Sequence, residues 1–361
     1  MEKKHIEYFD LIKGIGIFLV ILGHIQYISE TTRVFLVSFH MPLFFILSGL
    51  LMQISSEKER PLIDNIHRKA RRMLLPYFVY SCLDIIIYIG YYLLTGRDGG
   101  WPTVFMDIAM SLTFYGMSVL WFLPAIFIAE VLFLVLLRMG ERIAGLFSGL
   151  LWISAYFLNT ALENLNRLKG QDMIFSLFHL FSVALLRGII CMGFIAIGYY
   201  ISLGWSHLGR REALSPIKFS SITKIADLFL GFDFLVLTFV LSWINGMTDL
   251  HFLLLGNPFI YILAAVSGSL GVILLCKAFE GASRGLRLIS YYGKNSLMVM
   301  ATHLDFYVLL AAEIGAQHFT KYMTGNQKNT AFIILTFIFT LIGEMVIIEA
   351  YTMLKKRVGV R

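Results

Sequence analysis

The chain has 361 residues, of which 58% are hydrophobic and only 15% are charged. Its mean hydropathy is +0.76. A soluble globular domain rarely has this composition, whereas a membrane protein with many spans usually does. The formal net charge of +7 does not require a nucleic-acid partner, because basic loops beside membrane spans give the same excess. Cys82, Cys191 and Cys276 lie in apolar runs and are too few and too dispersed for a disulfide framework or a zinc site.

Apolar runs with a length close to the roughly 20 residues of a membrane-spanning helix follow one another along the chain. They are 11–29, 34–54, 73–95, 118–138, 143–160, 173–202, 225–246, 256–277, 289–316 and 329–354. The shorter run at 103–117 contains Asp107 and is predicted to be interfacial or re-entrant. The longest soluble segment expected between runs is the loop at about 203–224.

The sequence therefore predicts an all-α polytopic membrane protein with about ten transmembrane helices. These helices form one membrane domain over residues 1–361, with no appended soluble domain expected. The first run is not expected to be a cleaved signal peptide, because Lys13 breaks its apolar core and no small-residue cleavage site follows His24.

The placement of lysine and arginine gives these runs an orientation. If the N-terminus is cytoplasmic, 22 of the 30 basic residues fall in inner segments, six fall in outer segments, and Lys13 and Arg187 lie within runs. Basic residues concentrate on the cytoplasmic side of membrane proteins. The sequence therefore predicts that both termini are cytoplasmic and that the protein lies in the inner or plasma membrane.

The stretch 8–27 carries three polar residues that a spanning helix rarely contains, namely Asp10, Lys13 and His24. A charged side chain at the bilayer centre costs roughly 2.5–3.5 kcal/mol on insertion scales, so such residues usually face protein or water. From Lys13 to His24 a helix turns by about 1100°, which is three turns plus about 20°, and advances by about 16 Å. Lys13 and His24 therefore lie on one stripe. An Asp10–Lys13 ion pair that fixes helix packing is the alternative to a functional role.

The second run contains His40-Met41-Pro42-Leu43-Phe44-Phe45 and, one turn later, Ser48-Gly49. Pro42 removes a backbone donor and frees a carbonyl that neighbours or water must satisfy. Ser48 and Gly49 are small and allow a second helix to approach closely. His40 is predicted at the depth of His24, where it is either a packing residue or part of a polar cavity.

The inner loop after the second run reads His67-Arg68-Lys69-Ala70-Arg71-Arg72. Basic residues just inside a span are the usual topology signal. The spacing indicates more, because Arg68 and Arg71 are three residues apart, as are Lys69 and Arg72, and one helical turn brings each pair together. Guanidinium and ammonium groups arranged in this way suit phosphate oxygens. The loop is a candidate site for a cytosolic phosphorylated ligand.

Further polar residues occur in the later runs. Glu130 in the fourth run and Arg187 in the sixth have similar predicted depths, which favours a structural Arg–Glu pair. Trp121 opens the fourth run and is compatible with an interface anchor. His303 and Asp305 in the ninth run are two residues apart, so they face different sides of a helix and indicate a wet interior.

Several well-known site motifs are not found in the sequence. It has no nucleotide-binding Gly-rich loop, no His-Glu-x-x-His zinc motif and no Gly-x-Ser-x-Gly nucleophile elbow. It also has no basic soluble domain for nucleic acid. No metal, no tightly bound cofactor and no nucleic-acid partner is therefore predicted.

These residues resemble the acyltransferase 3 family of bacterial integral membrane acyltransferases over nearly the whole chain. Lys13, with His24 after ten intervening residues, is similar to the family's basic-x10-His motif. The resemblance is also carried by Tyr8-Phe9-Asp10, Phe39-His40-Met41-Pro42-Leu43-Phe44-Phe45 with Ser48-Gly49, the basic loop ending Leu74-Leu75-Pro76-Tyr77, Trp121-Phe122-Leu123-Pro124 and Gly293-Lys294-Asn295-Ser296.

The resemblance implies transfer of an acyl group, usually acetyl from acetyl-CoA, to a hydroxyl of a carbohydrate outside the cytoplasm. The acyl-CoA would be a co-substrate, and the acceptor a polysaccharide or lipid-linked sugar of the cell envelope. By this likeness His24 matches the family's essential histidine and Lys13 its upstream basic residue, with Asp10 beside it. Many relatives carry an additional C-terminal soluble domain that is not expected in this chain.

The resemblance also implies a donor site in the inner loop. The family's Arg-x-x-Arg best matches Arg68 and Arg71, although Lys69 and Arg72 have the same spacing and stay open as the alternative. All four residues are therefore candidates for binding acyl-CoA.

The chemistry is consistent with these residue types. Histidine, with an unperturbed pKa of about 6.5, suits removal of a hydroxyl proton. Polar groups in a low-dielectric cavity can stabilise the developing oxyanion. The candidates for such a cavity are His40, Ser48, Glu130, Arg187 and His303. Whether His24 acts as a base or is itself briefly acylated stays open.

A transporter or flippase for a lipid-linked sugar or a small anion is the alternative function, because intramembrane Asp, Lys, His and Arg fit it too. Secondary transporters often show inverted repeats and matched broken helices, and neither is found here. A non-enzymatic membrane sensor is a third possibility.

Overall fold

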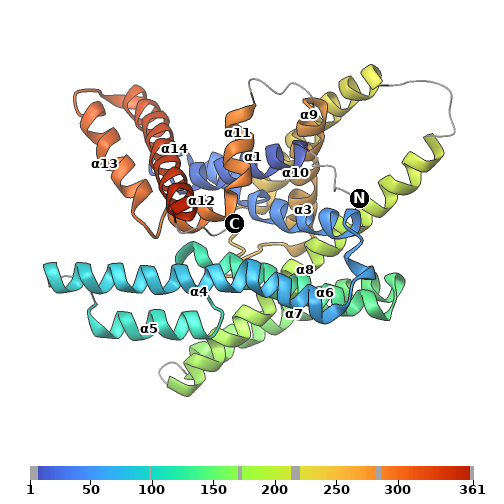
Figure 1. Cartoon of the computed structure of the whole chain (residues 1–361), viewed down its shortest axis with the longest axis horizontal. Helices are drawn as coiled ribbons and strands as arrows, with labels where there is room; N and C mark the ends of the chain where they lie inside the picture. The colour runs from blue at the N-terminus through green and yellow to red at the C-terminus, as the bar shows by residue number, and fades with distance from the viewer. Residues whose placement is uncertain (1–6, 97–98, 170–172, 213–219, 281–285, 358–361) are drawn as a thin grey trace. The chain divides into compact units, whose positions relative to one another are not determined.

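The computed structural model describes residues 7–96, 99–169, 173–212, 220–280 and 286–357. Across these ranges it is built of helices, and the only β-type pairing is an isolated bridge between Asp249 and Leu254 (Figure 1). Six of the basic residues used to predict the orientation lie outside the described residues, namely Lys3, Lys4, Arg97, Lys218, Arg284 and Arg361.

Eight stretches in the described part of the chain are long and apolar enough to cross a membrane. They are Glu30–Ile54, Leu62–Thr95, Ser118–Met139, Glu141–Arg167, Met173–His207, Lys224–Asn245, Pro258–Ala278 and Gly325–Arg357. The prediction of an all-α polytopic membrane protein is confirmed. The orientation of the termini stays a prediction.

Two predicted runs differ from these eight stretches. The first run forms α1 (Glu7–His24), which has 18 residues and carries Asp10 and Lys13 near its start. The run at 289–316 is not one continuous helix, because it is divided among α11 (Arg287–Lys294), α12 (Ser296–Thr302) and α13 (Val308–Thr320). The break before α13 is a tight turn in which Tyr307 adopts a positive φ of 57°.

Two further segments of the chain contain more helix than was predicted from the sequence. The predicted loop at about 203–224 is helical at both ends, because α8 extends to Glu212 and α9 begins at Ser220. The short run at 103–117 forms α5 (Trp101–Leu112), whose 12 residues are too few to cross a bilayer.

The described chain forms two compact units. Unit 1 comprises Met1–Met41, Phe219–Thr248 and Phe259–Arg361, and unit 2 comprises Pro42–Lys218 and Asp249–Pro258. Besides α1, α11, α12 and α13, unit 1 contains α2 (Glu30–Val37), α9 (Ser220–Asn245), α10 (Pro258–Ala278) and α14 (Gly325–Arg357). Helix α3 (His40–Ile54) begins at the end of unit 1's first segment and continues into unit 2.

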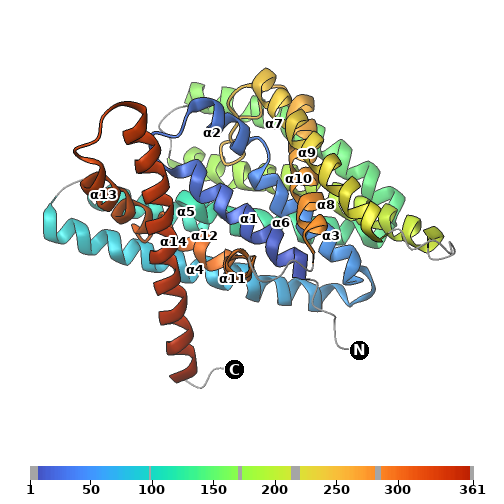
Figure 2. The same cartoon turned by 90° about the horizontal axis from the view of Figure 1, so that it is seen from above.

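Unit 1 is organised around α1, which packs along α11 and also contacts α12 and α14. Helices α13 and α14 lie side by side in both views (Figures 1 and 2). The contact between α1 and α11 is backbone against backbone, since a Cβ added at Gly293 would collide with the carbonyl of Asp10. This contact accounts for the glycine in Gly293-Lys294-Asn295-Ser296 and fixes the start of α1.

We expect Gly293→Ala to lower the free energy of unfolding by about 1–3 kcal/mol, because overpacking a close contact forces the helices apart. Gly149→Ala is the matched control, since a Cβ at this helical glycine meets nothing within 4 Å in the described structure. The control is expected to be neutral or stabilising. Denaturation of the full chain in detergent measures both, and equal stability of the two variants would contradict the α1–α11 contact.

Unit 2 is organised around α6 (Phe122–Met139), which packs against α4 (Leu62–Thr95), α7 (Glu141–Lys169) and α8 (Met173–Glu212). Helix α5 lies alongside α4 (Figure 1). Helix α3 meets α8 at Gly49 and Gly198, where an added Cβ would collide with the backbone of the other helix. The predicted close approach at Gly49 is therefore confirmed.

Candidate active site

His24 is the last residue of α1, and its side chain is exposed. Its Nδ1 lies 2.8 Å from the carbonyl oxygen of Val20, one turn earlier. A carbonyl oxygen only accepts hydrogen bonds, so Nδ1 of the neutral ring carries the proton and the lone pair lies on Nε2. The end of α1 therefore holds an imidazole in the tautomer that a general base or nucleophile needs.

A second imidazole lies against His24. The rings of His24 and His303 have centroids 5.2 Å apart and meet edge to face at 62°. His303 is fully buried, and its Nδ1 lies 2.9 Å from the carbonyl of Val299 and 3.0 Å from that of Met300. The sequence prediction placed His303 in the middle of a span. It instead follows α12 directly, and the turn after it brings it to the end of α1.

His40 has the same internal hydrogen bond as the other two histidines, with Nδ1 2.7 Å from the carbonyl oxygen of Leu36. It is buried at the start of α3. The helix therefore also fixes the tautomer of His40. Its place in a polar cavity stays a prediction.

Asp10 and Lys13 form an ion pair on α1, with Oδ1 of Asp10 3.8 Å from Nζ of Lys13. Asp10 is buried, whereas the Lys13 side chain is 25% exposed. Because α1 is continuous, Lys13 lies about 16 Å and Asp10 about 21 Å along the axis from His24. Any part of Asp10, Lys13 or His24 in catalysis stays a prediction.

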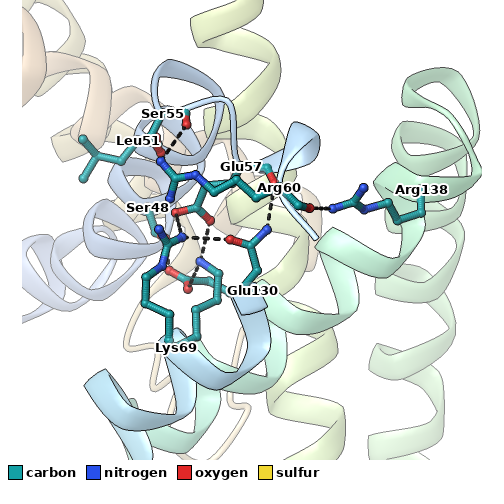
Figure 3. Close-up of polar contacts among 10 residues, drawn as sticks. Ser48, Leu51, Ser55, Glu57, Arg60, Lys69, Glu130 and Arg138 are labelled. Atoms are coloured by element: carbon teal, nitrogen blue, oxygen red, sulfur yellow. Dashed lines mark hydrogen bonds and ion pairs between the residues drawn. The ribbon is translucent and has the colours of Figure 1, made fainter. Parts of the chain in front are cut away.

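In unit 2, Lys69 and Glu130 form a buried ion pair, with Nζ 2.5 Å from Oε2 (Figure 3). Lys69 is also 2.7 Å from Oε2 of Glu57. Ser48 donates to the other oxygen of Glu130. The Lys69 and Glu130 side chains are each only 6% exposed, so α3, α4 and α6 are joined by an ionic cluster inside the unit.

The predicted Glu130–Arg187 pair is wrong. Glu130 faces α4, where Lys69 supplies its counter-charge. Arg187 on α8 instead donates from Nη1 to the backbone carbonyl of Tyr115 at 2.7 Å. A similar predicted depth did not place the two residues together, because the Glu130 side chain faces α4 and the Arg187 side chain faces the segment that contains Tyr115.

The four basic residues of the inner loop fall into two classes. Lys69 is buried between two carboxylates, whereas Arg68, Arg71 and Arg72 are exposed. Arg68 also donates to Glu57 at 2.8 Å and to Asn65 at 2.9 Å. Steps of about 100° per residue put the three arginines within an arc of about 100° on α4. The arginines are therefore better candidates than Lys69 for contact with an anionic ligand.

Arg187 lies in a cluster of aromatic side chains. Its guanidinium carbon is 4.9 Å from the ring centroid of Tyr115 and 5.2 Å from that of Trp121. His251 stacks on Trp121, with centroids 5.3 Å apart and planes at 3°. Trp121 is only 6% exposed, so it packs inside unit 2 rather than acting solely as an interface anchor.

Two polar residues of unit 2 and unit 1, the half-buried Tyr115 and the buried Glu344, were not identified from the sequence. Tyr115 supplies both a carbonyl and a ring to Arg187. Glu344 on α14 is fully buried, and its Oε2 accepts a 2.7 Å hydrogen bond from Thr302, the residue before His303. A carboxylate in the apolar run 329–354 is the signal that could have identified Glu344. Within the described ranges, no three His, Cys, Asp or Glu side chains converge as metal ligands would.

The comparisons with known proteins identify the family. The family model described as an acyltransferase domain, that of the acyltransferase 3 family, matches residues 6–349. Neither the curated proteins nor the solved structures gave a significant match. The match spans both units and nearly the whole chain. With its apolar helices, the chain therefore belongs to the acyltransferase 3 family and is a membrane acyltransferase.

Proposed function

We propose that this protein transfers an acyl group, with acetyl as the default, from cytosolic acyl-CoA to a hydroxyl of an extracytoplasmic or lipid-linked carbohydrate. The observation that carries the proposal is His24, whose Nδ1 is held by the carbonyl of Val20 at the end of a continuous helix. This bond directs the basic lone pair to Nε2, where a hydroxyl proton can be received.

The reaction needs one proton acceptor and no redox partner. Nε2 of His24 takes the proton of the carbohydrate hydroxyl while its oxygen attacks the thioester carbonyl. The tetrahedral intermediate collapses with cleavage of the carbon–sulfur bond. The CoA thiolate leaves, and the imidazolium returns the proton to it. The products are a carbohydrate O-ester and free CoA.

The donor site is assigned to the exposed arginine face of α4, formed by Arg68, Arg71 and Arg72. CoA carries several phosphate groups, and guanidinium groups on adjacent turns bind phosphate oxygens in a forked geometry. Lys69 supports this face from behind through Glu57, which also holds Arg68. If both termini are cytoplasmic, as the basic residues predict, this face of α4 lies in the cytosol. The protein would then lie in the plasma or inner membrane.

Acetyl-CoA is expected to raise the melting temperature of the purified full chain, and Arg68→Ala/Arg71→Ala is expected to lose most of that shift. A ligand present at 100 times its Kd stabilises the native state by about 2.7 kcal/mol, which is readily measured. The control is Lys355→Ala/Lys356→Ala, which removes two exposed charges from the end of α14.

The same measurement separates the enzyme from its alternative. A transporter or flippase for a lipid-linked sugar has no reason to bind a CoA thioester, and its melting temperature would not respond. If the shift persists in the double arginine variant, the donor site lies elsewhere on the chain.

A further inference from the structure

Arg187 is a fully buried cation with no carboxylate within ion-pair distance among the described residues, although the more distant carboxylate of Asp249 acts on its charge. Nη1 donates to Tyr115, whereas Nε and Nη2 are buried and have no acceptor among the described residues. Glu130 is paired with Lys69, and Oδ1 of Asp249 accepts hydrogen bonds from the backbone N–H groups of His251 and Phe252. A buried charge without a close partner is strongly destabilising. In membrane proteins such residues commonly mark the path of a substrate or an ion.

The aromatic neighbours of Arg187 compensate only part of this cost. Its guanidinium contacts the rings of Tyr115 and Trp121, and such cation–π contacts are weakly stabilising. Ring faces attract the positive charge, but they do not replace an oxygen acceptor for the two N–H groups. Nε and Nη2 lie on one edge of the guanidinium, and that edge matches the two oxygens of a carboxylate or phosphate group.

His251 supplies a second unpartnered group in the same cluster. It stacks on Trp121 and also contacts Tyr115, with ring centroids 5.5 Å apart. Its Nε2 is buried and has no hydrogen-bond partner among the described residues. Burial and the nearby charge of Arg187 lower the pKa of His251 to about 3, so the ring is neutral at physiological pH. A neutral imidazole leaves Arg187 as the charge that an anion would meet.

The position of the cluster indicates which substrate brings the anion. Trp121, which contacts Arg187, immediately precedes α6. The arginines of α4 are tied to the region near the opposite end of that helix, because Arg68 pairs with Glu57 and the next residue, Lys58, pairs with Glu141 just beyond α6. The 18 residues of α6 span about 27 Å. CoA carries its charges on its phosphates, which the exposed arginines of α4 would hold, and its pantetheine arm is uncharged. An anion at Arg187 would therefore belong to the other substrate.

We propose that the Nε–Nη2 edge of Arg187 binds an acidic group, a carboxylate or a phosphate, on the carbohydrate acceptor, with Tyr115, Trp121 and His251 around it. The inference rests on the proposed function, since it names the class of acceptor for that reaction. Acidic sugars and sugar phosphates share the oxyanion chemistry that this edge recognises. Neutral sugars lack it.

Thermal stability of the full chain in detergent tests the proposal with three probes at matched ionic strength: glucuronate, glucose 1-phosphate and glucose. At least one anionic probe is expected to stabilise the wild-type protein more than glucose does, and the stronger of the two tells carboxylate from phosphate. Arg187→Gln is expected to raise the half-maximal probe concentration about tenfold or more, because charged hydrogen bonds are lost. Arg187→Lys keeps the charge but not the fork, and it is expected to lose most of the effect.

Arg167→Gln is the matched control, because Arg167 is an exposed arginine of the same unit. It is expected to retain the full response. Acetyl-CoA is measured in parallel to report folding and the donor site of each variant. Anionic probes that stabilise no better than glucose, or an Arg187→Gln variant that keeps the response, would overturn this inference while the acetyl-CoA shift remains. Absence of the acetyl-CoA shift in the wild-type protein would instead count against the proposed function.

Discussion

Lys69→Met is expected to lower the free energy of unfolding by about 3–5 kcal/mol, because it leaves two carboxylates without their shared buried cation. Glu130 is buried beside Ser48, and Glu57 would keep only its exposed partner Arg68. Lys69→Met/Glu130→Gln removes the stranded charge as well and is expected to recover part of the loss. Denaturation of the full chain in detergent measures each variant.

The control for Lys69 is a lysine in an exposed pair. Lys277 lies 3.1 Å from Asp227 with 48% of its side chain exposed, and such pairs contribute about 0–1 kcal/mol. Lys277→Met should therefore be close to wild type. If Lys69→Met were equally mild but abolished the acetyl-CoA shift, Lys69 would be a donor ligand rather than a structural cation.

His24→Ala is expected to reduce acyl transfer by about 10²–10⁴-fold, the usual contribution of a positioned acid–base group. The protein should still fold, because His24 is exposed, and it should still be stabilised by acetyl-CoA, because the arginines of α4 hold the donor. His24→Gln keeps a polar side chain but cannot take up a proton, so it should not restore the rate. Single-turnover assays with labelled acetyl-CoA measure these differences.

His318→Ala is the control for His24, since it removes another exposed histidine of unit 1. Its rate should equal that of the wild-type protein. Equal turnover in His24→Ala would exclude a catalytic role for His24. Labelled acetyl retained on wild-type protein but not on His24→Ala would indicate an acylated histidine in place of a general base.

The apolar runs predicted most of the helices, because a hydrophobic stretch of about 20 residues has few alternatives to a spanning helix. Continuity was harder to predict. The run at 289–316 is apolar enough to look continuous, but Tyr307 takes a left-handed conformation and the chain turns between α12 and α13. That turn places His303 against His24, a contact that depends on tertiary structure.

Which polar residues pair with one another could not be read from the sequence. Glu130 and Arg187 have similar predicted depths, but depth does not specify the neighbouring helix that a side chain faces. Lys69 resembled an ordinary topology signal, yet packing of α4 against α6 buries it beside Glu130. The candidate site residues were predicted by resemblance and residue type. Their partners required the fold.

The most direct test of the proposed reaction is the chemical form of transferred label. Wild-type protein in membranes that contain its carbohydrate acceptor, supplied with acetyl-labelled acetyl-CoA, is expected to place label on the carbohydrate as an alkali-labile ester, with release of free CoA. His24→Ala membranes should leave the carbohydrate unlabelled. Transport of the carbohydrate without any ester formed by the wild-type protein would contradict the proposed function.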